Sequence, residues 1–250
     1  MRTLLVYLSF LIFTPIMAGW VLLAALLGVK DRPGGVYDRA PHIWTRILVW
    51  AGGVRVVLHG TENLVTEPRV YASNHVSWFD VFVLASVIPR YKFVAKAELF
   101  RIPIFGPGAR AVGTIPIHRE NRKAAFGAYE EAAGRIRGGD SVIVFPEGTR
   151  GSSYDLRPFK KGPFVLAIAA QVPVVPVLVH GTIAVQSRET WLVRGGTVHV
   201  HFLEPVHTQG MDYEDRDRLA SAVWERTSAA LHELYGVGAP PMTDHSAAVG

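Results

Sequence analysis

The chain opens with 27 consecutive residues that carry no charge, residues 3–29. About 20 apolar helical residues cross the hydrocarbon core of a bilayer, so this run is long enough to span it. Pro15 interrupts the run and predicts a kink, which leaves a tilted or re-entrant segment as an alternative. A cleaved signal peptide fits poorly, because its apolar core is only about 7–15 residues long and no small-x-small cleavage site closes this run. We therefore expect this segment to attach the protein to a membrane.

Basic residues concentrate on the carboxyl side of the apolar run. Lys30, Arg32, Arg39 and Arg46 follow it, whereas only Arg2 and the amino terminus precede it. Cytoplasmic flanks of membrane segments carry an excess of Lys and Arg. The asymmetry therefore predicts that the bulk of the protein lies on the cytoplasmic side.

A second apolar stretch covers residues 43–54 and contains Trp44 and Trp50. Indole rings favour the headgroup level of a membrane. Together with the first run, this stretch predicts a helical hairpin over residues 1–57, at or in the membrane. A buried core helix is the alternative for the second stretch.

The composition excludes several classes of protein. Hydrophobic residues make up 49% of the 250 residues, which excludes a disordered or low-complexity chain. The absence of cysteine excludes a disulfide scaffold, a Cys-ligated metal site and a cysteine nucleophile. The net charge is +5, with +4 in residues 1–60, +6 in residues 90–123 and −4 in residues 204–233. This uneven charge indicates a partner with negative charge, such as a phospholipid, a phosphate ester or nucleic acid.

Apolar, β-branched runs alternate with helical stretches over the rest of the chain. Strands are expected at residues 54–58, 69–72, 92–95, 114–117, 141–145, 174–179 and 197–202. Helices are expected at residues 79–87, 121–137 with Asn121 as N-cap, 162–171 and 213–235. The alternation predicts an α/β sandwich over residues 58–236, built largely on one sheet, and a disordered tail at residues 237–250. Pro173 and Pro176 predict that their strand lies at an edge or borders a cavity.

Two groups that can act together in acid–base chemistry lie between an expected strand and an expected helix. His75 and Asp80 are five residues apart, so their side chains can converge if His75 is on the loop and Asp80 in the first helical turn. A buried carboxylate on one ring nitrogen fixes the tautomer and leaves the other nitrogen as a base. Such a spacing also occurs by chance, and a loop histidine beside a helix cap explains the pair alone better.

A second group lies in residues 144–150, Val-Phe-Pro-Glu-Gly-Thr-Arg, where an apolar strand runs into a turn. Gly148 permits a positive φ or the close approach of a ligand to backbone N–H groups. Arg150 can hold a phosphate through two hydrogen bonds. Glu147 would repel a phosphate, so we expect it to accept a hydroxyl hydrogen bond or to orient an arginine. A polar turn with a surface ion pair is the alternative.

Four segments in chain order resemble the lysophospholipid acyltransferase family, most closely its bacterial 1-acyl-glycerol-3-phosphate acyltransferases. The segments are Asn-His-x-Ser-x-x-Asp at residues 74–80, Gly-x-Ile-x-Ile-x-Arg at residues 113–119, Phe-Pro-Glu-Gly-Thr-Arg at residues 145–150 and Val-Pro-x-x-Pro at residues 172–176. The likeness covers residues 50–205. His118 departs from the family pattern, which commonly has an acidic residue at that position.

The resemblance implies the glycerol-3-phosphate acyltransferase-like fold, a mixed, largely parallel sheet flanked by helices. It implies that an acyl thioester, either acyl-CoA or acyl-acyl carrier protein, gives its acyl chain to the free glycerol hydroxyl of lysophosphatidate at the cell inner membrane. His75, held by Asp80, would be the general base, and the acceptor itself the nucleophile. Substrate-binding roles fall on Arg119, Glu147, Gly148, Thr149 and Arg150, and secondary roles on Asn74, Ser77, Lys160 and Lys161.

The same resemblance implies which partners to expect. They are membrane phospholipid, lysophospholipid and an acyl carrier protein, with no nucleic acid, no bound cofactor and no metal. His199 and His201 share one strand face that can suit a metal, but a half-solvated strand explains this alternation without one.

Other functions stay open from the sequence. A different lysolipid, such as a lyso-ornithine lipid, can accept the acyl chain by the same chemistry. A membrane-bound serine esterase would use Ser77, but no Gly-x-Ser-x-Gly motif surrounds that residue. A basic membrane protein without catalysis would have no need of an oriented base.

Overall fold

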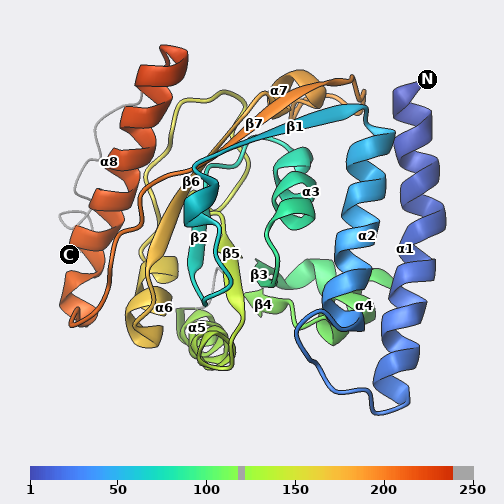
Figure 1. Cartoon of the computed structure of the whole chain (residues 1–250), viewed down its shortest axis with the longest axis horizontal. Helices are drawn as coiled ribbons and strands as arrows, with labels where there is room; N and C mark the ends of the chain where they lie inside the picture. Colours follow the sequence, from blue (N-terminus) through green and yellow to red (C-terminus); the bar gives the residue numbers. More distant parts are fainter. Residues whose placement is uncertain (118–121, 239–250) are drawn as a thin grey trace.

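A seven-stranded sheet forms the centre of the computed structural model, which describes residues 1–117 and 122–238. The strand order is β1-β7-β6-β2-β5-β3-β4, and all neighbouring strands are parallel except β6 and β7 (Figure 1). The strands are β1 (Val54–His59), β2 (Val70–Ser73), β3 (Tyr91–Lys96), β4 (Ile115–Ile117), β5 (Ser141–Val144), β6 (Val174–His180) and β7 (Gly196–Phe202). The mixed, largely parallel sheet confirms the predicted fold class.

Helices cover both faces of this sheet. On one face lie α5 (Arg122–Arg137), α6 (Gly162–Ala170) and α8 (Arg216–Tyr235), and on the other α1 (Arg2–Leu26), α2 (Val36–Ala51) and α3 (Trp78–Val87) (Figure 1). Two short helices, α4 (Phe105–Ala111) and α7 (Thr182–Val185), were not predicted, because they are too short to show a helical period. The expected N-cap Asn121 lies outside the described residues, as does the expected tail from residue 239.

Successive residues of the central strands supply opposite faces of the sheet. In β5, Ile143 packs on the side of α3, whereas Val142 and Val144 pack on the side of α5, α6 and α8. All four residues of β5 are buried. Strands covered on both faces read as continuous apolar runs, which is why the sequence reveals them. The carboxyl ends of β2 and β5 meet at one edge, which brings residues 73–80 and 145–150 together.

The expectation that Pro173 and Pro176 place their strand at an edge is wrong. Their strand, β6, lies in the interior of the sheet, between β7 and β2. Pro176 lies where the antiparallel pairing on this side is irregular, between the isolated pair Val174–Val206 and the regular register with β7, which begins at Val177. The carbonyl of Pro176 accepts a hydrogen bond from the backbone N–H of Leu203 at 2.9 Å, and such an irregularity is a position that suits a proline within a sheet.

The predicted N-terminal hairpin is present, and α1 and α2 lie side by side at one end of the molecule (Figure 1). Among the described residues, α1 is the one helix long and apolar enough to cross a membrane. Pro15 lies within this helix, which continues through it. The predicted boundary after residue 57 falls inside β1, so the hairpin leads directly into the sheet.

Helix α2 is longer than predicted and shows features of both alternatives considered for it. It begins at Val36 rather than at residue 43. The indole of Trp44 packs against the rings of Phe10 and Phe82 and donates a hydrogen bond from Nε1 to the Thr14 hydroxyl at 3.0 Å. Trp50 is 68% exposed. One side of α2 is thus core, and the other faces outward.

A group of charges around the buried Lys92 fixes the hairpin to the sheet. Nζ of Lys92, on β3, lies 3.1 Å from Oδ2 of Asp31 and 3.9 Å from Oδ1 of Asp38. The guanidinium of Arg90 forms ion pairs with Asp38 at 3.3 Å and with Asp140 at 2.6 Å. Asp31 lies in the linker between the two helices, and Asp38 lies in α2. The hairpin is therefore bound to the end of the sheet by charge pairs as well as by apolar contacts.

Candidate active site

The predicted pair of His75 and Asp80 comes together at the carboxyl end of β2. Nδ1 of His75 lies 3.0 Å from Oδ2 of Asp80. The chain turns here because Ser77 caps α3: its hydroxyl accepts a hydrogen bond from Phe79 N at 3.2 Å, while Asp80 accepts one from Ser77 N at 2.8 Å. This reciprocal cap directs the Asp80 carboxylate back toward the loop that carries His75.

The Asp80 carboxylate is fully buried and holds the His75 ring in one orientation. Besides the ring, Oδ2 accepts hydrogen bonds from the backbone N–H of Val76 at 2.6 Å, and Oδ1 accepts one from the Thr182 hydroxyl at 2.6 Å. The imidazole also stacks on Phe145, with ring centroids 4.1 Å apart. Nδ1 faces Asp80, and no hydrogen bond reaches Nε2 from the residues that the structure describes. Nε2 is therefore placed to accept a proton.

Glu147 links the two predicted segments and orients an arginine, as expected, but the arginine is Arg157. Oε1 of Glu147 accepts a hydrogen bond from the backbone N–H of His75 at 2.8 Å, and Oε2 pairs with Nε of Arg157 at 2.9 Å. Arg157 also donates to the hydroxyl of Thr149 at 2.8 Å and to its carbonyl oxygen. Burial raises the pKa of Glu147, against the opposing effects of these donors. Glu147 and Thr149 thus position the segment rather than face a ligand.

Gly148 shows the backbone conformation that its sequence position predicted. Its φ is +80°, and an added Cβ would lie 2.7 Å from Cε of Lys160. The exposed Lys160 side chain therefore occupies the space into which the side chain of any larger residue at position 148 would project. Lys160 and Gly148 also line a cavity of about 50 Å³ together with Phe145. The ring of Phe145 is the one on which His75 stacks.

Arg150 lies in the second predicted segment and is joined there by a second arginine. Its guanidinium stacks over the Trp78 ring at 4.7 Å, and its backbone carbonyl accepts a hydrogen bond from Arg188 at 2.6 Å. Burial, and then the charge of Arg188, lower the pKa of Arg150, while Asp80 acts in the opposite direction. No ion pair joins Arg150 to a carboxylate among the side chains that the structure describes. Two positive charges are thus placed together, and the residue that follows Arg150, Gly151, donates its backbone N–H to the His75 carbonyl at 2.7 Å.

The other residues with implied roles bond neighbouring groups of the fold or lie outside the described residues. Both polar atoms of the Asn74 amide bond the backbone of Val179, at 3.0 and 2.8 Å, so Asn74 fixes the loop to β6. The Ser77 hydroxyl donates to the carbonyl of Gln186 at 2.7 Å. Lys161 pairs with Asp217 on α8 at 2.8 Å. Arg119 lies outside the described residues.

Sequence reasoning missed Thr182, Arg157 and Arg188. Thr182 follows β6, which is the parallel neighbour of β2. Because parallel strands place their carboxyl ends at the same edge of a sheet, the segment after β6 was a place to look for a further site residue. Arg157 immediately precedes Pro158-Phe159-Lys160-Lys161-Gly162, a segment that resembles the family. For Arg188, we find no signal in the sequence.

Comparisons with known proteins agree with the site. The Acyltransferase family model matches residues 55–180. The chain is 32% identical to 1-acyl-sn-glycerol-3-phosphate acyltransferase BAT2, chloroplastic, of Brassica napus, over 72% of this chain and 54% of the relative. It is also 32% identical to 1-acyl-sn-glycerol-3-phosphate acyltransferase of Limnanthes alba, over 92% of this chain and 80% of the relative. The chain thus spans about half the length of some of these relatives and most of others.

A solved structure shows the same architecture over nearly the whole chain. The crystal structure of the 1-acyl-sn-glycerophosphate (LPA) acyltransferase PlsC from Thermotoga maritima superposes with a TM-score of 0.78, at 25% identity, over 94% of this chain and 95% of that one. The residues outside the superposed 94% are fewer than the 25 residues of α1, so the match extends into the N-terminal helices. Together with the family match over half of the chain, this confirms the resemblance drawn from the four motifs, and the chain belongs to the acyltransferase family.

Proposed function

We propose that this protein transfers a fatty acyl chain from an acyl thioester to the free glycerol hydroxyl of lysophosphatidate, which gives phosphatidate. The observation that carries the proposal is the His75–Asp80 pair, with Nδ1 held at 3.0 Å and Nε2 open, beside the two arginines. The names of the relatives support the same substrate class.

The chemistry follows from the orientation of the imidazole. Nε2 of His75 removes the proton from the acceptor hydroxyl as that oxygen attacks the thioester carbonyl. The buried Asp80 carboxylate stabilises the imidazolium that forms. When the tetrahedral intermediate collapses, the carbon–sulfur bond breaks, and the imidazolium returns its proton to the leaving thiolate. The acceptor oxygen is the nucleophile, so Ser77 has no covalent role.

Arg150, with Arg188 behind it, is the described group best placed to bind the phosphate of the acceptor. A guanidinium binds a phosphate through two parallel hydrogen bonds, and the charge of a second arginine strengthens the attraction. We assign Arg119 to the same proposed site only because it ends the Gly-x-Ile-x-Ile-x-Arg motif at residues 113–119. A lyso-ornithine lipid lacks this phosphate, so the paired arginines favour lysophosphatidate over it.

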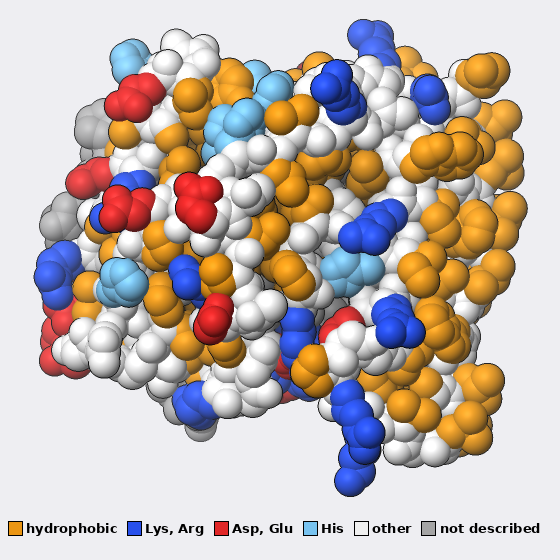
Figure 2. Space-filling model, in the orientation of Figure 1, with side chains coloured by type: hydrophobic (Ala, Val, Ile, Leu, Met, Phe, Trp, Pro, Cys, Tyr) orange, Lys and Arg blue, Asp and Glu red, His pale blue; other side chains and the backbone are white. Residues whose placement is uncertain are grey.

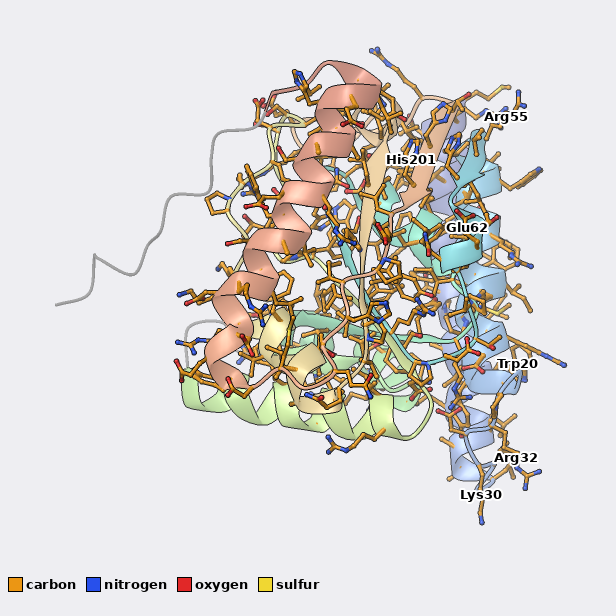
Figure 3. The ribbon with its side chains drawn as sticks, turned by 60° about the vertical axis from the view of Figure 1, so that its left-hand side comes forward. Trp20, Lys30, Arg32, Arg55, Glu62 and His201 are labelled. Atoms are coloured by element: carbon orange, nitrogen blue, oxygen red, sulfur yellow. The ribbon has the colours of Figure 1, made fainter. Side chains whose placement is uncertain are left out.

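We further propose that the exposed side of α1 lies in the membrane. Large apolar side chains cover that side, among them Leu11 (71% exposed), Ile16 (52%) and Leu23 (53%). Figure 2 shows hydrophobic atoms gathered along this edge, and Figure 3 places Trp20, Lys30 and Arg32 on it, where indole and basic groups suit lipid headgroups. The opposite side of α1 packs on α2 and α4, which supports a helix lying against one leaflet rather than crossing alone.

Two experiments test these proposals. Purified protein in detergent is given a labelled acyl-CoA or acyl-acyl carrier protein, with lysophosphatidate, lysophosphatidylcholine or a lyso-ornithine lipid as acceptor. We expect phosphatidate to be the main labelled product, and acylation of another lysolipid in its place would overturn the assignment.

For the membrane face, the triple variant Leu11→Gln, Ile16→Gln and Leu23→Gln should lose vesicle binding, whereas the equally exposed Leu234→Gln on α8 should keep it.

A further inference from the structure

Three histidines from two strands gather at the sheet edge that lies farthest from β4. His59 ends β1, while His199 and His201 lie on β7, and the parallel register places His59 directly beside His201. Figure 2 shows histidine side chains gathered near these strands, and Figure 3 shows His201 on the side of the sheet that faces α8. We call His59, His199 and His201 the three-histidine cluster. The proposed acyl transfer uses none of its members.

The ring nitrogens of the three-histidine cluster converge. One nitrogen of each ring lies within 4.8 Å of one nitrogen of each other ring, and Nε2 of His59 is 3.0 Å from Nδ1 of His199. Around a tetrahedral zinc ion with bonds of about 2.0–2.1 Å, ligand nitrogens lie roughly 3.3 Å apart. The His59 ring stacks on the His201 ring, with centroids 4.2 Å apart and planes 7° apart, so the exposed His59 and half-buried His199 side chains must turn into new rotamers for their nitrogens to point at one ion.

The surroundings supply no competing negative charge, and the contact between His59 and His199 is one that a bound ion would replace. No carboxylate forms an ion pair with these rings among the side chains that the structure describes. His201 is buried, and its Nε2 lies 2.8 Å from the phenol oxygen of Tyr235, the last residue of α8. A hydrogen-bond partner on one ring nitrogen is the usual companion of a metal-bound histidine, because it fixes the ring and its tautomer.

From this geometry we propose that His59, His199 and His201 bind one divalent transition-metal ion, of which zinc is the best match. Neutral imidazoles suit zinc, and three protein ligands leave the fourth position to water on the exposed side of His59. The sequence alone offered only the two histidines of β7, which a half-solvated strand explains. The third ligand comes from a strand 140 residues earlier.

The consequence of binding is mechanical, since the ligands join different parts of the fold. β1 is an edge strand that pairs with β7 alone. A metal ion shared by His59 and the two β7 histidines joins the carboxyl end of β1 to β7, and the Tyr235 contact extends the connection to the end of α8. Binding is therefore expected to raise the thermal stability of the protein.

The test uses the full chain without a polyhistidine tag, in detergent and stripped of metal with a chelator. Zinc is titrated in competition with a chromophoric chelator, and the expected result is one zinc ion per chain. His59→Gln and His199→Gln should each weaken binding by more than the roughly 10–100-fold that loss of a ligand's hydrogen-bond partner costs, and Tyr235→Phe should fall within that range. His207→Gln, an exposed histidine outside the cluster, is the matched control and should bind as the wild type.

A second measurement uses thermal stability in place of the chelator competition. Zinc should raise the Tm of the wild type and of His207→Gln, and leave the Tm of His59→Gln unchanged. Circular dichroism of the metal-free proteins checks that the variants fold. The proposal would be overturned if the wild type failed to bind zinc, or if His59→Gln and His199→Gln bound zinc as tightly as the wild type. Either result would hold whatever the acyltransferase assay shows.

Discussion

The hydroxyl of Thr182 donates a hydrogen bond of 2.6 Å to Oδ1 of Asp80, across 102 residues of sequence. Both side chains are fully buried. With Oδ1 engaged by Thr182, the other oxygen of the carboxylate is directed at the His75 ring. A residue beyond the familiar motifs therefore helps to orient the base.

Thr182→Val should lower kcat without abolishing activity, because it leaves one oxygen of a buried carboxylate unpaired. A hydrogen bond to a charged group contributes about 1.5–3 kcal/mol, which corresponds to roughly a tenfold effect or more. Thr182→Ser should restore kcat. Initial rates measured across pH check this, since a disturbed His75–Asp80 pair also shifts the pH profile. An unchanged kcat and pH profile in Thr182→Val would exclude a positioning role.

His75→Ala should lower kcat by about 10²–10⁴-fold or more, the usual contribution of a general base, and leave the fold intact. Asp80→Asn should also be severe, because an amide permits the wrong imidazole tautomer and does not stabilise the imidazolium. Single-turnover rates and circular dichroism of each variant provide the measurement. Wild-type activity in His75→Ala would remove the basis of the site.

Ser77→Ala separates direct transfer from an acyl-serine mechanism. The Ser77 hydroxyl caps α3 and donates to Gln186, so its loss should reduce stability by about 0.5–2 kcal/mol and leave acyl transfer largely intact. Tm and kcat are measured on the same preparation. A trapped acyl group on Ser77 in the wild type, with an inactive Ser77→Ala, would contradict the proposed mechanism.

Arg150→Ala should raise the KM for lysophosphatidate about tenfold or more, because each lost charge-assisted hydrogen bond contributes about 1.5–3 kcal/mol. The KM for the thioester should change less. Arg218→Ala, an exposed arginine on α8, is the control. If the acceptor KM is the same in Arg150→Ala as in the wild type, the phosphate binds elsewhere.

Glu147 should make the stability of the protein depend on pH. Burial raises its folded-state pKa above the unfolded value, so the folded chain binds the proton more tightly. Its contribution to stability is therefore lost as pH rises from the ordinary range of a glutamate through the raised pKa. Tm measured against pH should fall less steeply over that interval in Glu147→Gln than in the wild type. Parallel profiles would show that Glu147 does not titrate there.

Local patterns were enough to predict the sheet. Each strand was placed within one residue of its observed bounds, because strands such as β5 are buried on both faces and read as unbroken apolar runs. The His75–Asp80 pair needed more than local pattern, because its spacing alone fits a loop histidine beside a helix cap, and the resemblance of four motifs was what singled it out. The interior position of β6 was not predicted, because Pro176 is tolerated only where the pairing with another strand is irregular.

Contacts that depend on the tertiary fold were beyond reach. Glu147 was expected to orient an arginine, but nothing local distinguished Arg157 from Arg150. Thr182 reaches Asp80 only because β6 and β2 are parallel neighbours. His59 meets His201 only because β1 and β7 pair at the far edge of the sheet.

The pairing of the buried Lys92 with Asp31 and Asp38 has a geometric consequence for the proposed catalysis at a lipid surface. A catalytic domain on a flexible linker would sample a range of heights above the bilayer, set by linker length. Here the linker itself contributes a carboxylate to the end of the sheet, so the distance of His75 from the exposed apolar side of α1 is a constant of the fold. If that side lies in the membrane as proposed, the protein would select its acceptor by depth, because only a hydroxyl presented at this level would reach the imidazole.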